Sequence, residues 1–192
     1  MTKKGSETRA RILNAARSLY SSHGSDGTTL EDIITASGVT KGAFYHYFNS
    51  KEVLCLELIE LVTKEYEDMI EGIDPCLGPV DKLQELIRTL DQLNSSGKWV
   101  NGKLMIRLSA DSDDGHPEMK EKLGNFWRRF SRVFEEIIEQ CQQAGQLTQN
   151  IDAHTQAKMI MSLIAGSITF ERIDSREKGF AEAVNILIEK LR

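Results

Sequence analysis

Residues 29–54 read TLEDIITASGVTKGAFYHYFNSKEVL, and this stretch decides the fold. Thr29 and Asp32 have the spacing of a reciprocal helix cap, in which each side chain accepts a hydrogen bond from the other residue's backbone. Gly38 follows the short apolar face of that helix and supplies the positive φ with which many helices end. Thr40 then offers a cap for a second helix. The stretch therefore predicts two short helices joined by a tight turn.

The second expected helix has two different faces. Phe44 and Phe48 are four residues apart, which places both rings on one face, and we expect that face to be core. The opposite face carries groups suited to contacts with nucleic acid, namely Lys41, Tyr45, His46 and Tyr47. Any one of them alone is an ordinary solvated helix residue. Their position beside the turn favours a DNA-binding helix-turn-helix over that reading.

This stretch resembles the TetR family of transcriptional regulators, whose pattern runs T-x-x-x-I-A-x-x-x-G-V-(S/T)-x-G-x-x-Y-x-(H/Y)-F-x-(S/N)-K-E-x-L. One departure is Ile34, where the family usually has Ala and the two helices pack closely. Beyond this motif, only the expected helical architecture resembles the family. The matching positions are Thr29, Ile33, Gly38, Val39, Thr40, Gly42, Tyr45, Tyr47, Phe48, Ser50, Lys51, Glu52 and Leu54.

The resemblance implies a role for each exposed position of the motif, with double-stranded DNA as the partner. Gly42 has no side chain, which allows the start of the second helix to approach the groove. The positions implied to contact base edges are Thr40, Lys41, Gly42 and Tyr45. The positions implied to contact phosphates are Thr29, His46, Tyr47 and Lys51.

Charge is distributed unevenly along the chain. The formal net charge is −5, which argues against a uniformly basic nucleic-acid binder. Residues 1–51, however, contain seven Lys and Arg against four Asp and Glu, so this part carries +3 and the remainder carries −8. A basic N-terminal part on an acidic remainder is typical of a protein that presents one end to DNA.

The rest of the chain has helical periodicity throughout and no alternating strand pattern, which predicts an all-α protein of about nine helices. We expect a three-helix DNA-binding domain over residues 1–50 and a helical effector-binding and dimerisation domain over residues 51–192. Residues 1–6 are predicted to be a polar arm. Besides the two helices of the motif, the expected helices span 7–23, 51–70, 79–93, 99–110, 117–145, 153–168 and 176–191.

Catalytic and metal chemistry find little support. The three cysteines are at unrelated spacings, and the four histidines have no metal-ligand spacing, so we predict no metal, cofactor or catalytic residue. Cys76, in the Gly- and Pro-containing break after residue 71, is the one candidate redox sensor. The apolar run over 159–170 is too short to span a membrane, and the polar N-terminus lacks a signal peptide, so a cytoplasmic location is expected.

Aromatic residues gather in the predicted second domain. Such clusters are more often plain core, but in the family the equivalent helices enclose an effector cavity. The resemblance therefore implies a small, largely apolar effector as a second partner. The candidate ligand-binding residues are Trp99, Met105, Arg107, Phe126 and Phe130, with Arg107 as the polar anchor.

The last two helices are too apolar for the surface of a monomer and predict a homodimer, which is also how the family pairs. We expect a ligand-responsive regulator, a repressor, that binds a palindromic operator as a dimer and is released by its effector. The alternative is an all-α enzyme that carries a helix-turn-helix. The candidate interface residues are Ala165, Gly166, Val184 and Leu187.

Overall fold

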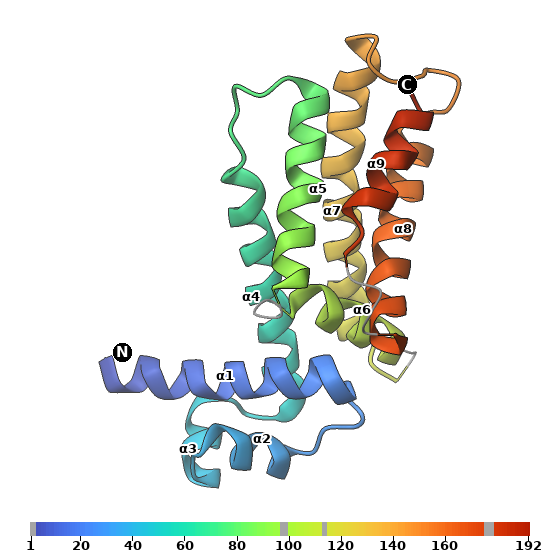
Figure 1. The fold of residues 1–192 in the computed structure, drawn as a ribbon. Coiled ribbons are helices and arrows are strands. Elements are labelled where there is room, and N and C mark those ends of the chain that lie inside the picture. The colour runs from blue at the N-terminus through green and yellow to red at the C-terminus, as the bar shows by residue number, and fades with distance from the viewer. Residues whose placement is uncertain (1–2, 97–99, 113–114, 175–178) are drawn as a thin grey trace. The chain divides into compact units, whose positions relative to one another are not determined.

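The computed structural model describes residues 3–96, 100–112, 115–174 and 179–192. These residues form nine helices and no strand, so the all-α prediction is confirmed. Figure 1 shows the helices in chain order. Their bounds are α1 (Lys3–His23), α2 (Leu30–Ser37), α3 (Lys41–Tyr47), α4 (Lys51–Glu71), α5 (Pro79–Ser95), α6 (Asn101–Asp111), α7 (Pro117–Gln143), α8 (Ala153–Ile173) and α9 (Ala181–Lys190).

The chain packs into two compact units. The first unit comprises residues 1–65 and 103–124, and the second comprises 66–102 and 125–192. Helices α4, α6 and α7 each contribute residues to both units. These units are defined by packing, and their limits differ from the domain boundary at residue 50 that the sequence predicts. The domain boundary itself stays a prediction.

The first unit is built around the packing of α1 on α2, with α3 and the first part of α4 completing the core. Many of the apolar residues that the periodicity placed inside are fully buried, as are both phenylalanines of α3, whereas Leu30 and Ile34 are half-buried. These buried residues are Ile12, Ala16, Tyr20, Ile33, Phe44, Phe48, Leu54 and Leu58.

The starts of α1 and α9 differ from the sequence prediction by several residues. Helix α1 begins at Lys3 rather than at Glu7, so the expected polar arm is mostly helical. Nothing in this segment breaks a helix, because a single Gly costs only about 1 kcal/mol and no Pro is present. Helix α9 begins at Ala181, preceded by Phe180 as its N-cap, whereas the prediction began at residue 176. Residues 175–178 lie outside the described residues.

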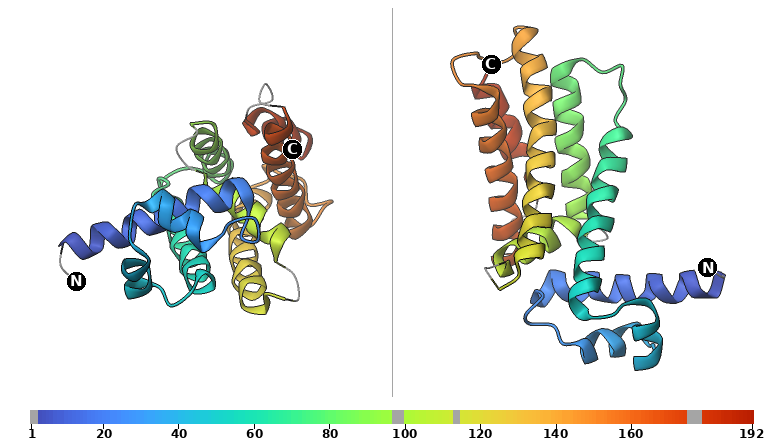
Figure 2. Two further views of the ribbon diagram at one scale, coloured as in Figure 1. Left: turned by 90° about the horizontal axis from the view of Figure 1, so that it is seen from below. Right: turned by 180° about the vertical axis from the view of Figure 1, so that it is seen from behind.

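In the second unit, α5, α8, α9 and the part of α7 from Asn125 onward run side by side (Figures 1 and 2). Helix α9 packs against both α5 and α8. The turn between α7 and α8 is closed by two glutamines: Gln142 and Gln156 each donate from Nε2 to the carbonyls of Thr148 and Ile151, at 2.8–2.9 Å. This amide network fixes the end of the bundle in place.

Candidate nucleic-acid interface

The first helix of the motif has the predicted cap. Thr29 Oγ1 accepts a hydrogen bond from the Asp32 backbone N–H at 3.1 Å, and Asp32 Oδ2 accepts one from the Thr29 backbone N–H at 2.8 Å. The Thr29 hydroxyl also donates to Asp32 Oδ2 and thereby lowers the pKa of this carboxyl. Gly38 ends the helix at φ 62°, in the left-handed region. The sequence prediction for this turn is confirmed.

Helix α3 presents its polar face to solvent. Thr40 Oγ1 caps the helix by accepting from the Ala43 backbone N–H at 3.1 Å. Opposite the buried phenylalanines, Lys41 and Gly42 are exposed and Tyr45 is 46% exposed. A Cβ added to Gly42 would meet no described atom within 4 Å. His46 is exposed and Tyr47 is half-buried beside it. The start of α3 is therefore open to a large partner.

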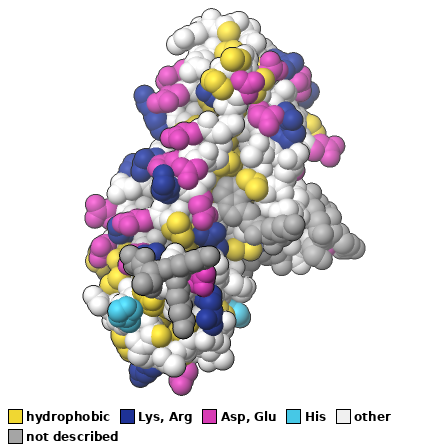
Figure 3. Space-filling model, turned by 90° about the vertical axis from the view of Figure 1, so that its left-hand side faces the viewer, with side chains coloured by type: hydrophobic (Ala, Val, Ile, Leu, Met, Phe, Trp, Pro, Cys, Tyr) yellow, Lys and Arg dark blue, Asp and Glu magenta, His cyan; other side chains and the backbone are white. Residues whose placement is uncertain are grey.

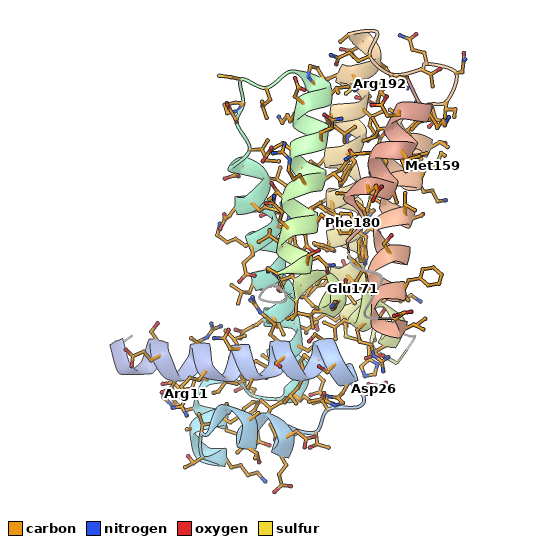
Figure 4. All side chains as sticks on the ribbon, in the orientation of Figure 1. Arg11, Asp26, Met159, Glu171, Phe180 and Arg192 are labelled. Atoms are coloured by element: carbon orange, nitrogen blue, oxygen red, sulfur yellow. The ribbon has the colours of Figure 1, made fainter. Side chains whose placement is uncertain are left out.

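Arg11 joins α1 to the turn of the motif. Its Nη2 donates to the carbonyls of Ser37, at 2.6 Å, and Gly38, at 2.9 Å, at the C-terminal end of α2 (Figure 4). A cation is favourable here because the carbonyls at a helix C-terminus carry partial negative charge. Arg11 thus fixes the angle at which the turn leaves α2. Sequence reasoning missed it, since the two partners are 26 and 27 residues away.

Lys51 has an intramolecular role beside its predicted phosphate contact, which stays a prediction. Its Nζ donates to the carbonyls of Ser25, at 2.8 Å, and Thr28, at 3.0 Å, in the connection between α1 and α2. Two of the three ammonium N–H groups are therefore used inside the unit. Lys51 therefore holds this connection against the start of α4.

The predicted polar ligand anchor, Arg107, is also engaged within the first unit. Its Nη2 donates to the His23 carbonyl at 3.3 Å, and its Nε lies 3.6 Å from Asp111 Oδ1. Asp111 Oδ2 in turn accepts from the Ser25 backbone N–H at 2.7 Å. Met105, a second predicted ligand residue, is completely buried in the same unit. Arg107 therefore anchors the end of α1, and its role as a polar ligand anchor stays a prediction.

The other predicted ligand residues belong to the second unit or lie outside the described residues, as Trp99 does. Phe126 and Phe130 stack with their ring centroids 5.7 Å apart. Tyr66 lies against both, with centroid distances of 5.2 and 5.1 Å. These aromatic side chains form one wall in the second unit. The five predicted residues are not gathered within one unit.

The second unit exposes a stripe of apolar side chains. Phe170 is 66% and Ile173 is 78% exposed, and Met159 lies on the same helix (Figure 4). A Cβ at Gly166, in the middle of this stripe, would meet no described atom within 4 Å. Helix α9 adds Ile186, which is 57% exposed.

The structure corrects one predicted interface residue. Val184 is completely buried inside its own chain, and Leu187 is only half-buried. The side of α9 that carries Val184 packs within the unit, so the exposed side is marked by Ile186 instead. Ala165 and Gly166 are both partly exposed on α8, and their interface role stays a prediction.

Acidic and basic side chains alternate over much of the face drawn in Figure 3. Ion pairs in the first unit include Arg9 with Glu57 and Arg17 with Glu65. Among the described residues, no group of His, Cys, Asp or Glu has a metal-binding arrangement. None of the described helices has the length and apolar character needed to cross a membrane.

The first unit contains a capped helix pair whose second helix is exposed, and the second unit is a helical bundle. These features together are those of a helix-turn-helix regulator. Residues 12–58 match the model for bacterial regulatory proteins of the tetR family, and residues 79–187 match the tetracyclin repressor-like C-terminal domain. The chain therefore belongs to the TetR family. This family and its curated members are transcriptional regulators rather than enzymes.

Individual relatives span the whole chain. The uncharacterized HTH-type transcriptional regulator YxaF of Bacillus subtilis (strain 168) is 36% identical, with 99% of each chain covered. The HTH-type transcriptional regulator UidR of Escherichia coli (strain K12) is 26% identical over 98% of this chain and 94% of its own. A TetR family regulator from Agrobacterium tumefaciens shares the fold with a TM-score of 0.88 at 18% identity, covering 97% of this chain and 98% of its own.

Proposed function

We propose that this protein is a repressor that binds a palindromic operator as a homodimer and releases it when a small, largely apolar effector binds. The observation that carries the proposal is the start of α3, where Lys41, Gly42 and Tyr45 are exposed beside a fully formed cap. A helix N-terminus without a side chain at Gly42 suits close approach to the major groove. The proposed place of action is the cytoplasm.

The proposed base contacts come from the first turns of α3, namely Thr40, Lys41, Gly42 and Tyr45. The proposed phosphate contacts come from Thr29, His46 and Tyr47, which flank these positions. Lys51 is left out because two backbone carbonyls already accept from its ammonium. Arg11 acts indirectly, since it holds the carbonyls at the end of α2 and so sets the turn that leads into α3.

The apolar stripe of α8 is the proposed dimer interface. Met159, Phe170 and Ile173 expose large side chains to solvent, and Gly166 between them allows a partner helix to approach closely. An exposed apolar stripe of this kind is costly on a monomer and is typical of an obligate interface. Helix α9 contributes through Ile186. Two subunits then present two α3 helices to half-sites about 34–36 Å apart.

The effector is proposed to bind in the second unit against the wall of Tyr66, Phe126 and Phe130. This wall is apolar except for the Tyr66 hydroxyl, which matches a largely apolar ligand. Helix α4 contributes residues to both units and is the proposed coupling element. The effector must bind the released state more tightly than the DNA-bound state, and a preference of about 1–3 kcal/mol would weaken operator binding about 5- to 150-fold.

In the first step of the test, the purified protein selects an operator from random duplexes. The affinity of the protein is then measured for a duplex with two half-sites and for a duplex with one half-site. The double variant Phe170→Asp, Ile173→Asp should sediment as a monomer and bind the palindrome about 10²- to 10⁴-fold more weakly, because the second half-site no longer binds intramolecularly. Gln140→Asp, an exposed change on α7, is the control. A variant that stays dimeric would move the interface elsewhere, and failure to select any palindrome would refute the proposed DNA function.

A further inference from the structure

The first unit contains a cleft of about 240 Å³ that the proposed function does not use. Three segments form it: the connection after α1, the first two turns of α4, and the segment that begins α7. All of its lining residues belong to this one unit. They are Ser25, Glu52, Cys55, Leu56, Gly115, His116, Pro117, Glu118 and Met119.

The floor of the cleft is apolar and uncharged. Cys55 and Met119 are both buried, and the Cys55 thiol lies 3.8 Å from the Met119 sulfur. Burial raises the pKa of the Cys55 thiol to about 12, so the thiol is neutral and a poor nucleophile. Leu56 is half-buried beside these residues. The floor therefore favours an alkyl group rather than an electrophile or a charged group.

The rim of the cleft is negatively charged. Glu52 and Glu118 are both exposed, and the Ser50 hydroxyl lowers the pKa of Glu52, which keeps this carboxylate ionised. Lys51, the adjacent cation, directs its ammonium to two backbone carbonyls, and the charges of Lys51 and His116 contribute less than the Ser50 hydroxyl to lowering the pKa of Glu52. His116 is half-buried, with Nε2 4.0 Å from Asp26 Oδ1. An incoming cation thus meets two carboxylates at the edge of an apolar floor.

We propose that this cleft is a second small-molecule site, for a primary ammonium with a short alkyl chain. Its volume lies below the range of about 300–1,000 Å³ that holds drug-sized ligands, so the ligand is small. None of the described lining residues is Phe, Tyr or Trp, so the cleft lacks the cage of these rings that recognises quaternary ammonium groups. Carboxylates accept hydrogen bonds from N–H donors, which a primary ammonium supplies. This binding does not depend on the proposed DNA function.

The experiment titrates hexylammonium into the full chain, with isotope-labelled methionine methyl groups observed by NMR and no DNA present. Substitution of Met119 by Leu identifies the Met119 signal, which should shift saturably. Hexanol and hexyltrimethylammonium should bind more weakly, because one lacks the charge and the other lacks N–H donors. Glu52→Gln combined with Glu118→Gln should weaken hexylammonium binding about 2- to 25-fold, at about 1.5- to 5-fold for each exposed carboxylate. Glu121→Gln, an exposed change one turn further along α7, should leave affinity unchanged.

A second variant tests the volume of the cleft separately from the charge of its rim. Leu56→Trp fills the cleft, leaves both carboxylates in place, and should abolish the Met119 shift, with thermal unfolding confirming that each variant folds. The proposal is wrong if hexanol binds as well as hexylammonium, if the double Gln variant binds normally, or if the Met119 signal does not move. Because operator binding is measured separately, a protein that binds hexylammonium but selects no operator would refute only the DNA function.

Discussion

The two units hold their parts together by different means. In the first unit, cationic side chains donate to backbone carbonyls at helix ends and turns: Arg11 at the end of α2, Lys51 in the α1–α2 connection, and Arg107 at the end of α1. In the second unit, aromatic rings pack against one another, and two neutral glutamines donate hydrogen bonds to backbone carbonyls. The first unit fixes its turns through charged donors, whereas the second uses ring packing and neutral amide donors.

This difference matches what each unit is proposed to do. A surface that reads DNA needs its turns at fixed angles, and hydrogen bonds to carbonyls specify a turn geometry in a way that apolar contacts do not. An effector site instead needs an apolar wall, which the aromatic side chains supply without charged groups that would need partners. We therefore expect substitutions in the two units to have different effects on stability, effector response and DNA binding.

The largest effect is expected in the second unit. Phe130 is 7% exposed and contacts the rings of Tyr66, Phe126 and Phe134, so Phe130→Ala should lower the free energy of unfolding by about 3–5 kcal/mol. Phe130→Leu leaves a smaller void and should lower the free energy of unfolding by less than half as much as Phe130→Ala. Chemical denaturation measures both. The Ala variant should also lose its response to the effector, and a loss below about 1 kcal/mol would mean that these rings are not the core of the unit.

The next effect tests the hydrogen bonds of the first unit. Lys51→Met keeps the aliphatic stem but leaves the carbonyls of Ser25 and Thr28 without their donor, so the unfolding free energy should fall by about 1–3 kcal/mol. The salt dependence of DNA binding by the folded variant should stay as in the parent, because the ammonium does not contact phosphate. A fall in the salt slope with unchanged stability would restore Lys51 as a phosphate contact.

Lys41 provides the matched comparison, since it is also a lysine at the first position of a helix in the same unit. It is exposed, so Lys41→Met should change stability by no more than about 0.5 kcal/mol. Operator affinity should fall and sequence preference should relax, and the slope of log affinity against log salt should decrease by at most about 1. Fluorescence anisotropy at several salt concentrations measures both. An unchanged affinity for every duplex would remove Lys41 from the interface.

The sequence predicted local features of both units and missed most long-range ones. The cap at Thr29, the left-handed Gly38 and the buried Phe44 and Phe48 follow from spacings of three or four residues, and all were confirmed. The contact between Arg107 and His23 spans 84 residues and leaves no periodic signal. A long side chain can reach many carbonyls, and only the fold decides which one accepts.

Periodicity also identified an apolar stripe on the last helix without saying what covers it. The sequence predicts a place for Val184 in a dimer interface, but Val184 is buried within its own chain, while Ile186, two residues on, is exposed. Two residues turn a helix by about 200°, so these side chains point to nearly opposite sides. An apolar stripe predicts burial, and either the same chain or a partner provides it.

The smallest effect compares one cap from each unit. Asp32 has its pKa lowered mainly by the Thr29 hydroxyl, and Asp152 mainly by the Thr155 backbone N–H, so each carboxylate is favoured in the folded state. A lowered pKa means that the stabilisation is complete above the unfolded value, about 3.9, and is lost as the pH falls through the lower folded value. Asp32→Asn and Asp152→Asn should therefore show a small, constant loss of stability near neutral pH that shrinks at acidic pH. If the loss due to either substitution instead grew as the pH fell, the ionised carboxylate would not be the stabilising form at that cap.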